Sequence, residues 1–197
     1  MQNIVAIVMA AGLSSRMGTF KQLLPYKDKK VISSIVEVLL LSQITNTYVV
    51  VGHNKELIQQ ELSDYNITII FNPDYEQGMH TSVMCAVKSI PSDCDGFMMV
   101  LGDQPEISVK LVDELIKAKS NTDKGIIIPS FANRKGHPVI FDKKYIEQAR
   151  NLDPNKGLKA LVQNNKDDID YLIVNDESVL FDIDTPSDYE NLIKRTY

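Results

Sequence analysis

The sequence contains no tryptophan and only two cysteines, Cys85 and Cys94. Two thiols provide neither a disulfide framework nor the spacing of a metal site, so we expect Cys85 to be a small core residue on the apolar face of a helix. No apolar run approaches the roughly 18 residues that a membrane-spanning helix needs, and no secretion signal is evident at the start. We therefore expect a cytoplasmic protein in a reducing environment, without a membrane partner.

Positive charge is also scarce. The 21 lysines and arginines are outnumbered by 26 aspartates and glutamates, which gives a net charge of −5. This balance argues against nucleic acid as a partner, although a local cationic loop can still bind a nucleotide. The length of 197 residues, with 44% hydrophobic residues, indicates an ordinary globular chain of a single domain.

The Gly-Lys-Ser/Thr run of the Walker loop is absent, and so is the dinucleotide fingerprint. A different glycine-punctuated stretch, residues 8–25, follows an apolar run over residues 4–8 that we interpret as a buried strand. Its small residues and free N–H groups can surround an anion, and Arg16 and Lys21 add positive charge. The stretch predicts a phosphate-binding loop at the carboxyl end of the first strand. The alternative is an ordinary turn with two solvated cations.

The following segments alternate between helix and strand. Apolar spacing predicts a helix over 29–42, a strand over 47–51, a helix over 55–62 capped by Asn54, and a strand over 67–71. This order indicates a mostly parallel sheet with right-handed crossovers, and hence an α/β fold.

A polar connection over residues 72–82 leads into a helix predicted over 81–88. The N-terminus of this helix would lie at the carboxyl edge of the sheet, where free N–H groups favour an anionic ligand. Thr81 and Ser82 add hydroxyl groups. A capped helix after a loop, without a ligand, is the alternative.

Asp103 directly follows an apolar strand predicted over 95–101. Mg²⁺ is commonly held by one or two carboxylates together with substrate phosphates, so this position favours a metal ligand. Asp103 could instead cap the helix predicted over 108–118, but Ser108 is the better cap there. Asp182 or Asp184 would supply a second carboxylate if the late strand, predicted over 178–181, returns beside strand 95–101.

The pattern of residues changes in the last third of the chain. Strands are predicted over 125–129 and 138–141, and the excursion between them carries Arg134 and His137, which could meet a second anionic substrate or simply form a solvated loop. The remaining expectations are helices over 143–150 and 158–164 with a basic turn at 155–157, a strand over 169–174, and a final helix ending at Arg195 that Thr185 or Ser187 could cap.

Five segments, in the same order, resemble motifs of the molybdenum cofactor cytidylyltransferases. They are residues 10–25, 72–82, 101–105 (Leu-Gly-Asp-Gln-Pro), 136–141 and 182–189. The resemblance implies a three-layer α/β/α Rossmann-like, GT-A-like nucleotidyltransferase fold, with an NTP-binding half (1–120) and an acceptor-binding half (121–197). It also implies transfer of CMP from CTP to molybdenum-bearing molybdopterin, with release of pyrophosphate and with Mg²⁺, or Mn²⁺, as cofactor.

The resemblance and this chemistry together assign the site residues. Nucleotidyl transfer requires alignment and charge neutralisation but no protein nucleophile. The expected catalytic residues are Arg16, Lys21 and Asp103, and the expected metal ligands are Asp103 and Asp184. Arg134 and His137 are expected on the acceptor side, and the expected nucleotide-binding residues are Ala10, Ala11, Gly12, Ser14, Arg16, Lys21, Asn72, Gly78 and Ser82.

Three alternatives remain open. The guanylyltransferases of the same pathway resemble this chain but typically carry a second glycine where Ala11 stands and a different segment at 78–82. A sugar or polyol phosphate is a second possible acceptor, because this architecture hosts many reactions. The third is a nucleotide-binding regulator without turnover, against which the joint presence of Lys21, Asp103 and Asp184 speaks.

Overall fold

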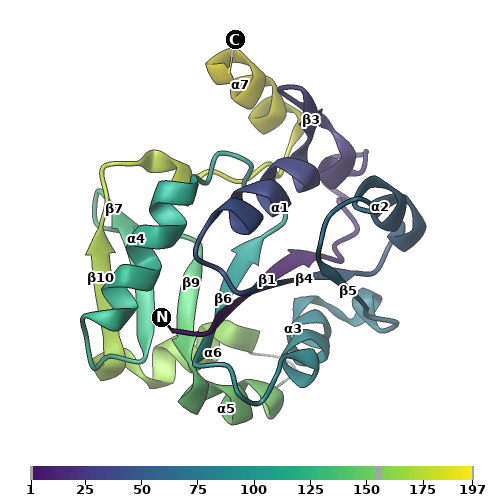
Figure 1. Cartoon of the computed structure of the whole chain (residues 1–197). Coiled ribbons are helices and arrows are strands. Elements are labelled where there is room, and N and C mark those ends of the chain that lie inside the picture. The colour runs from purple at the N-terminus through teal and green to yellow at the C-terminus, as the bar shows by residue number, and fades with distance from the viewer. Residues whose placement is uncertain (1, 154–156, 197) are drawn as a thin grey trace.

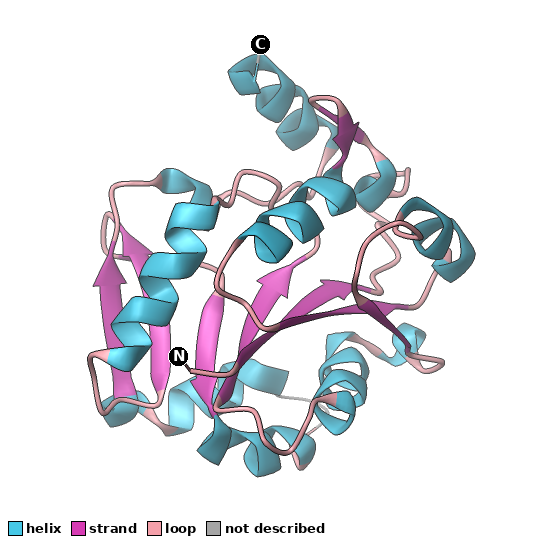
Figure 2. Cartoon of the chain, in the orientation of Figure 1, coloured by secondary structure: helices cyan, strands magenta, loops and turns pink. Residues whose placement is uncertain are grey.

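A mostly parallel β-sheet forms the centre of the molecule in the computed structural model, which describes residues 2–153 and 157–196 (Figure 2). In spatial order its strands are β10 (Ile169–Ile173), β7 (Ile126–Phe131), β9 (Val139–Asp142), β6 (Gly96–Leu101), β1 (Ile4–Ala10), β4 (Asn46–Val51) and β5 (Thr68–Phe71), and β8 (Arg134–Lys135) pairs with β7. Among the described strands of this sheet, β8 and β9 alone run opposite to the rest.

Helices cover both faces of this sheet (Figure 1). Because side chains alternate along a strand, Ala6 and Val8 of β1 pack into one core and Val5 and Ile7 into the other. The first core is covered by α1 (Val31–Leu41), α2 (Lys55–Glu61) and α4 (Val109–Ser120), and the second by α3 (Met79–Ser89), α5 (Ile146–Arg150) and α6 (Gly157–Asn164). The predicted three-layer α/β/α fold is confirmed, and Cys85 packs against the second core as expected.

Short elements connect these layers. The hairpin of β2 (Pro25–Tyr26) and β3 (Lys29–Lys30) precedes α1, so this helix begins two residues later than the predicted 29. The last helix, α7 (Pro186–Thr196), reaches this hairpin, where the Tyr189 hydroxyl donates to the Pro25 carbonyl over 2.7 Å. The 3₁₀ helices are η1 (Lys21–Leu23), η2 (Tyr75–Gln77), η3 (Lys143–Tyr145), η4 (Lys166–Asp168) and η5 (Glu177–Leu180).

Two local predictions are wrong. The expected strand over 178–181 is the 3₁₀ helix η5, because the Asp176 carboxylate accepts a hydrogen bond from the Ser178 N–H at 2.9 Å and turns the chain. Asn54 precedes α2 but makes no side-chain cap, and its φ of 56° is left-handed. Ser108 does cap α4, by accepting from the Leu111 N–H at 3.2 Å. The basic turn predicted at 155–157 lies largely outside the described residues.

The carboxyl ends of β1 and β6 position the site. The two strands are parallel neighbours with Met9 opposite Leu101, so the loops that follow them leave the same edge of the sheet. The Gly102 N–H donates to the Met9 carbonyl over 3.1 Å. A Cβ on Gly102 would lie 2.6 Å from that oxygen, so only glycine permits this approach. Among the described residues, no helix is long and apolar enough to cross a membrane.

Candidate active site

The loop after β1 folds back on itself. Ser14 adopts a left-handed φ of 52°, and its carbonyl accepts from the Met17 N–H at 3.0 Å. The Ser14 hydroxyl lies 3.4 Å from the Lys21 N–H and 3.3 Å from the buried Gln22 side-chain oxygen. Gly12 is exposed, with open space where a side chain would be. The loop therefore fixes the start of η1, and with it Lys21, while it leaves room above Gly12.

Lys21 is the centre of an ion-pair cluster. Its Nζ lies 2.5 Å from Asp103 Oδ2 and 3.1 Å from Asp184 Oδ1, and Arg16 contacts the other Asp184 oxygen at 2.9 Å. The Lys21 and Asp103 side chains are only 12% and 15% exposed, whereas Arg16 is 72% exposed. Burial alone would lower the pKa of Lys21, but the charge of Asp103 and hydrogen bonds to Asp103 and Asp184 raise it above its ordinary value. Lys21 is thus a permanent cation.

Three carboxylates meet beside this lysine. Asp103, Asp182 and Asp184 each offer an oxygen, and these atoms all lie within 4.8 Å of one another. Burial, followed by the charges of Asp103 and Asp184, raises the pKa of Asp182. Asp103 Oδ1 is buried without a hydrogen-bond partner among the residues the structure describes. Hard oxygen ligands with an unsatisfied buried atom fit a divalent cation such as Mg²⁺ or Mn²⁺.

The turn that carries Asp184 is held by a capping box at the start of α7. Asp188 Oδ2 accepts from the Thr185 N–H and hydroxyl, both at 2.7 Å, and from the Asp184 N–H at 3.2 Å. The Asp188 N–H in turn lies 3.3 Å from the Thr185 hydroxyl, which makes Thr185 the cap. These bonds, the Thr185 hydroxyl first, lower the pKa of Asp188. Sequence reasoning missed Asp188, although Thr-x-x-Asp is the spacing of a capping box.

A second hydrogen-bond network stabilises the segment after β5. The buried Asn72 side chain donates both amide hydrogens, to Thr81 and Ser82, each at 2.9 Å. Its oxygen accepts from the Asp74 N–H at 3.0 Å. Gly78 precedes α3 with a φ of 112°. Asn72 and Ser82 thus bind each other rather than the ion-pair cluster, and their side chains shape the loop that leads to α3.

His137 and Arg134 line different hollows. Arg134 is exposed on β8 and lines a pocket of about 180 Å³ with Phe181 and Arg195. His137 lines a cavity of about 610 Å³ between the sheet and helices α3 and α6. Burial lowers the pKa of His137, against the opposing charge of Asp182, so the imidazole is neutral at pH 7. Its Nδ1 is buried without a partner in the described part of the chain.

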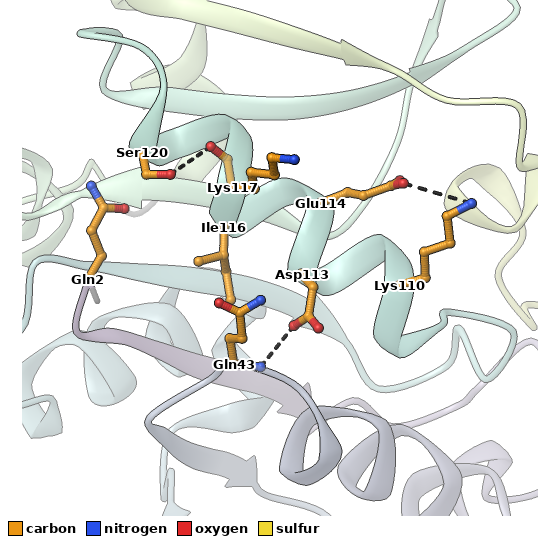
Figure 3. A pocket seen from close by; sticks show the side chains of 8 residues that line it. All are labelled: Gln2, Gln43, Lys110, Asp113, Glu114, Ile116, Lys117 and Ser120. Carbon is orange, nitrogen blue, oxygen red and sulfur yellow. Dashed lines mark hydrogen bonds and ion pairs between the residues drawn. The ribbon is translucent and has the colours of Figure 1, made fainter.

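A further pocket of about 430 Å³ lies at the opposite edge of the sheet (Figure 3). Gln2 and Gln43, which precede β1 and β4, line it together with the exposed face of α4. Several of its polar groups pair with one another, as in the 2.8 Å bond from the Gln43 N–H to Asp113, whereas the buried Gln2 Oε1 has no partner among the described residues. None of the cluster residues lines this pocket, so the candidate active site is the edge that holds Lys21.

Known proteins resemble this chain over almost its whole length. A family model described as the MobA-like NTP transferase domain matches residues 6–169. The chain is 30% identical to the molybdenum cofactor cytidylyltransferase of Escherichia coli K12, over 96% of this chain and 95% of that protein. It is 26% identical to a probable molybdenum cofactor guanylyltransferase of Natranaerobius thermophilus, over 98% and 96% of the two chains.

Solved structures share the fold. Rv0371c of Mycobacterium tuberculosis H37Rv, in complex with manganese, superposes with a TM-score of 0.83 at 24% identity over 98% of both chains.

Proposed function

Because this chain belongs to the MobA-like NTP transferase family of nucleotidyltransferases, we propose that it transfers CMP from CTP to molybdenum-bearing molybdopterin. Pyrophosphate is the second product. The E. coli relative, whose name states this activity, spans nearly the whole chain at 30% identity. The observation that carries the proposal is the meeting of Lys21 with Asp103, Asp182 and Asp184, which come from the beginning, the middle and the end of the sequence.

The reaction breaks one phosphoanhydride bond and forms another. An oxygen of the acceptor's terminal phosphate attacks the α-phosphorus of the nucleotide, and the bond to the β-phosphate breaks. The electron pair of that bond leaves with pyrophosphate. Such a step asks the protein to align two anions and to neutralise charge. Lys21 and Arg16 supply positive charge for the leaving group, and the loop around Gly12 admits the triphosphate.

Asp103 and Asp184 are the proposed metal ligands, with Asp182 beside them. A Mg²⁺ or Mn²⁺ ion held there would act as a Lewis acid and as a template for the phosphate oxygens. The manganese complex of the mycobacterial fold relative supports this choice of ion class. A cation at these oxygens would also neutralise the negative charge of the carboxylates, which Lys21 now neutralises. Lys21 would then be released from its ion pairs to bind phosphate.

The remaining roles belong to the same proposal. Ala10, Ala11 and Ser14 would shape the triphosphate loop, and Asn72, Gly78 and Ser82 would hold the segment beside the base and ribose. His137 and Arg134 are proposed on the acceptor side. The two residues line different cavities. The acceptor-side role is better supported for His137, because its cavity is the larger of the two.

Pyrophosphate release tests the proposal directly. The purified protein is incubated with molybdenum cofactor and Mg²⁺, and CTP, GTP, ATP and UTP are offered separately. Release with CTP alone is expected. Release with GTP alone would instead place the chain with the guanylyltransferases.

If none of the four nucleotides released pyrophosphate, this acceptor would be excluded, and sugar or polyol phosphates would then be tested. NTP binding without turnover on any acceptor would support the alternative that the protein is a nucleotide-binding regulator.

A further inference from the structure

Strand β10 forms an open edge of the central sheet. It pairs with β7 on one side, and none of the described strands lies on its other side (Figure 1). The Val174 N–H, one position after the strand, donates to the Ser130 carbonyl of β7 over 3.0 Å. Successive residues of a strand direct their backbone groups to alternate sides of it. The N–H and C=O groups of Ile169, Tyr171 and Ile173 therefore point away from the sheet, where they can bind a further strand.

The side chains of this edge are apolar and exposed towards its end. Because side chains alternate along a strand, Tyr171 and Ile173 share the face of Ile169, which belongs to the second core. Tyr171 is 40% exposed and Ile173 is 72% exposed, and no large apolar side chain among the described residues is more exposed than Ile173. Lysine and proline commonly protect such edges, and β10 contains neither.

The opposite edge of the sheet is protected in this way. Phe71 ends β5, and the Lys55 Nζ lies 4.0 Å from the centre of its ring. The two edges thus differ, and β10 is the one that is suited to association.

The strand β10 is complementary to itself. In an antiparallel pair of two copies centred on Tyr171, Ile169 of each copy lies opposite Ile173 of the other, and the two Tyr171 side chains are neighbours. All three outward-facing residues then exchange backbone hydrogen bonds across the pair. Aromatic and β-branched cross-strand pairs stabilise such a contact, and the exposed Ile173 is covered.

Charge favours this register over its neighbours. Asp170 is the one charged residue in the sequence of β10, and in the register centred on Tyr171 it lies opposite Leu172. A register centred on Asp170 would place two carboxylates directly opposite each other, which is destabilising. A register centred on Leu172 would place Asp168 opposite Asp176. Both shifted registers also lose one of the three hydrogen-bonded pairs.

From these observations we propose that β10 is a self-association surface, on which a second copy of this chain adds its own β10 antiparallel. The result is a closed twofold dimer with one continuous sheet. Because the paired strands are short, the dimer is expected to be weak and reversible. Three strands separate β10 from β1 in the sheet, so the inference goes beyond the proposed function and does not depend on it.

Sedimentation velocity of the purified protein, from about 1 μM to about 1 mM, tests the inference over the range of weak association. A reversible shift from monomer to dimer is expected. Ile173→Lys should raise the Kd of the dimer at least about tenfold, because it places a lysine at the edge. The matched control is Leu57→Lys on α2, where a leucine is 49% exposed; it should leave the Kd within about twofold.

A second variant should act in the opposite direction. The two Asp170 carboxylates are diagonal neighbours in the proposed register, about 7–8 Å apart. Asp170→Asn removes their repulsion and should lower the Kd about two- to threefold. Thermal unfolding verifies that each variant folds.

Cysteine cross-linking tests the register. The twofold axis would bring the two thiols of Tyr171→Cys onto residues with a Cα separation of about 5.5 Å, within reach of a disulfide. Ile173→Cys is the matched control, and both variants retain the native Cys85 and Cys94. Its two thiols would lie four residues apart along the strand, about 13 Å. Mild oxidation should therefore cross-link Tyr171→Cys and leave Ile173→Cys monomeric under denaturing conditions.

Four results would overturn the inference: a protein that remains monomeric at about 1 mM, an unchanged Kd in Ile173→Lys, equal disulfide yields from the two cysteine variants, or species larger than a dimer, since a twofold contact closes on itself. Pyrophosphate release should be the same in wild type and Ile173→Lys. Dimerisation without pyrophosphate release from any nucleotide would contradict the proposed function alone.

Discussion

At the scale of single residues, Lys21 and the three aspartates depend on each other. The lysine neutralises carboxylates that would otherwise repel one another within 4.8 Å. A divalent cation at the same oxygens would make part of that neutralisation redundant. The cluster is thus a place where stability and metal binding are linked, which a substitution of the lysine can expose.

We expect Lys21→Gln to lower the free energy of unfolding by about 1–3 kcal/mol without metal, because it leaves partly buried carboxylates uncompensated. Turnover should fall about 10²–10³-fold, as for other lost charge-stabilising groups. Added Mg²⁺ should raise the unfolding temperature of the variant more than that of wild type, since the ion replaces the missing charge. Lys30→Gln in β3 is the control; equal Mg²⁺ shifts in both variants would contradict the link.

The second prediction at the residue scale concerns how the stability that His137 contributes depends on pH. Burial lowers its folded pKa below the ordinary 6.5, so unfolded chains bind more protons between these two values. The stability that the neutral imidazole contributes is therefore complete above pH 6.5 and is lost as the pH falls towards the folded pKa. Urea unfolding at pH 7.5 and 5.5 should show a smaller loss of stability for His137→Gln than for wild type. An unchanged difference would refute the assignment of a buried neutral imidazole.

At the scale of elements, the start of α7 combines a helix cap with support for a proposed metal ligand. The Asp188 carboxylate that completes the capping box also binds the backbone N–H of Asp184. Asp188 is therefore a positioning residue, because it orients a proposed metal ligand without contacting the reacting groups.

Asp188→Ala is expected to cost about 1 kcal/mol of stability through the lost cap. It should also weaken apparent Mg²⁺ affinity about 10–100-fold, the usual cost of losing a group that orients a ligand. The matched control is Ser108→Ala, which removes the cap of α4 at a similar cost in stability, although its hydroxyl binds the Leu111 N–H and none of the three carboxylates. A Mg²⁺ titration of turnover separates the two, and identical curves would leave Asp188 with only its capping role.

Elements with strong local signals were predictable from the sequence. The apolar runs of β1, β4, β5 and β6 and the cap at Ser108 needed no tertiary information. The segment around η5 was mispredicted as a strand because its apolar residues face the core from a 3₁₀ helix: Val179 is fully buried, and the Asp176 side chain turns the backbone. Periodicity records that a residue is apolar, not what its backbone binds.

At the scale of the whole molecule, the site depends on contacts between distant parts of the chain. The Ile183 N–H donates to the Asp103 carbonyl over 3.0 Å, which brings Asp184 to a lysine 163 positions earlier. The sequence could nominate Asp182 and Asp184 but could not place both near Asp103, since that depends on how the last segment returns. Nor could it show that Asn72 and Ser82 bind each other. The proposed halves 1–120 and 121–197 thus both contribute carboxylates to the proposed metal site.

Two glycines test how closely the sheet edge and the loop above it must fit. A Cβ on Gly102 would lie 2.6 Å from the Met9 carbonyl oxygen and 3.3 Å from the Ala10 Cα, so Gly102→Ala must push β6 away from β1. We expect a loss of about 1–3 kcal/mol, typical of forced overpacking. Gly12→Ala meets no atom within 4 Å and should leave stability within about 0.5 kcal/mol.

The proposed triphosphate would occupy the open space above Gly12, and a methyl group there would obstruct it. Gly12→Ala should therefore raise the KM for CTP severalfold while the protein remains as stable as wild type. Urea unfolding and steady-state kinetics on the two variants together check both expectations. If Gly12→Ala left the KM unchanged, the nucleotide would not approach the loop at this point, and the triphosphate would have to lie closer to the segment around Gly78.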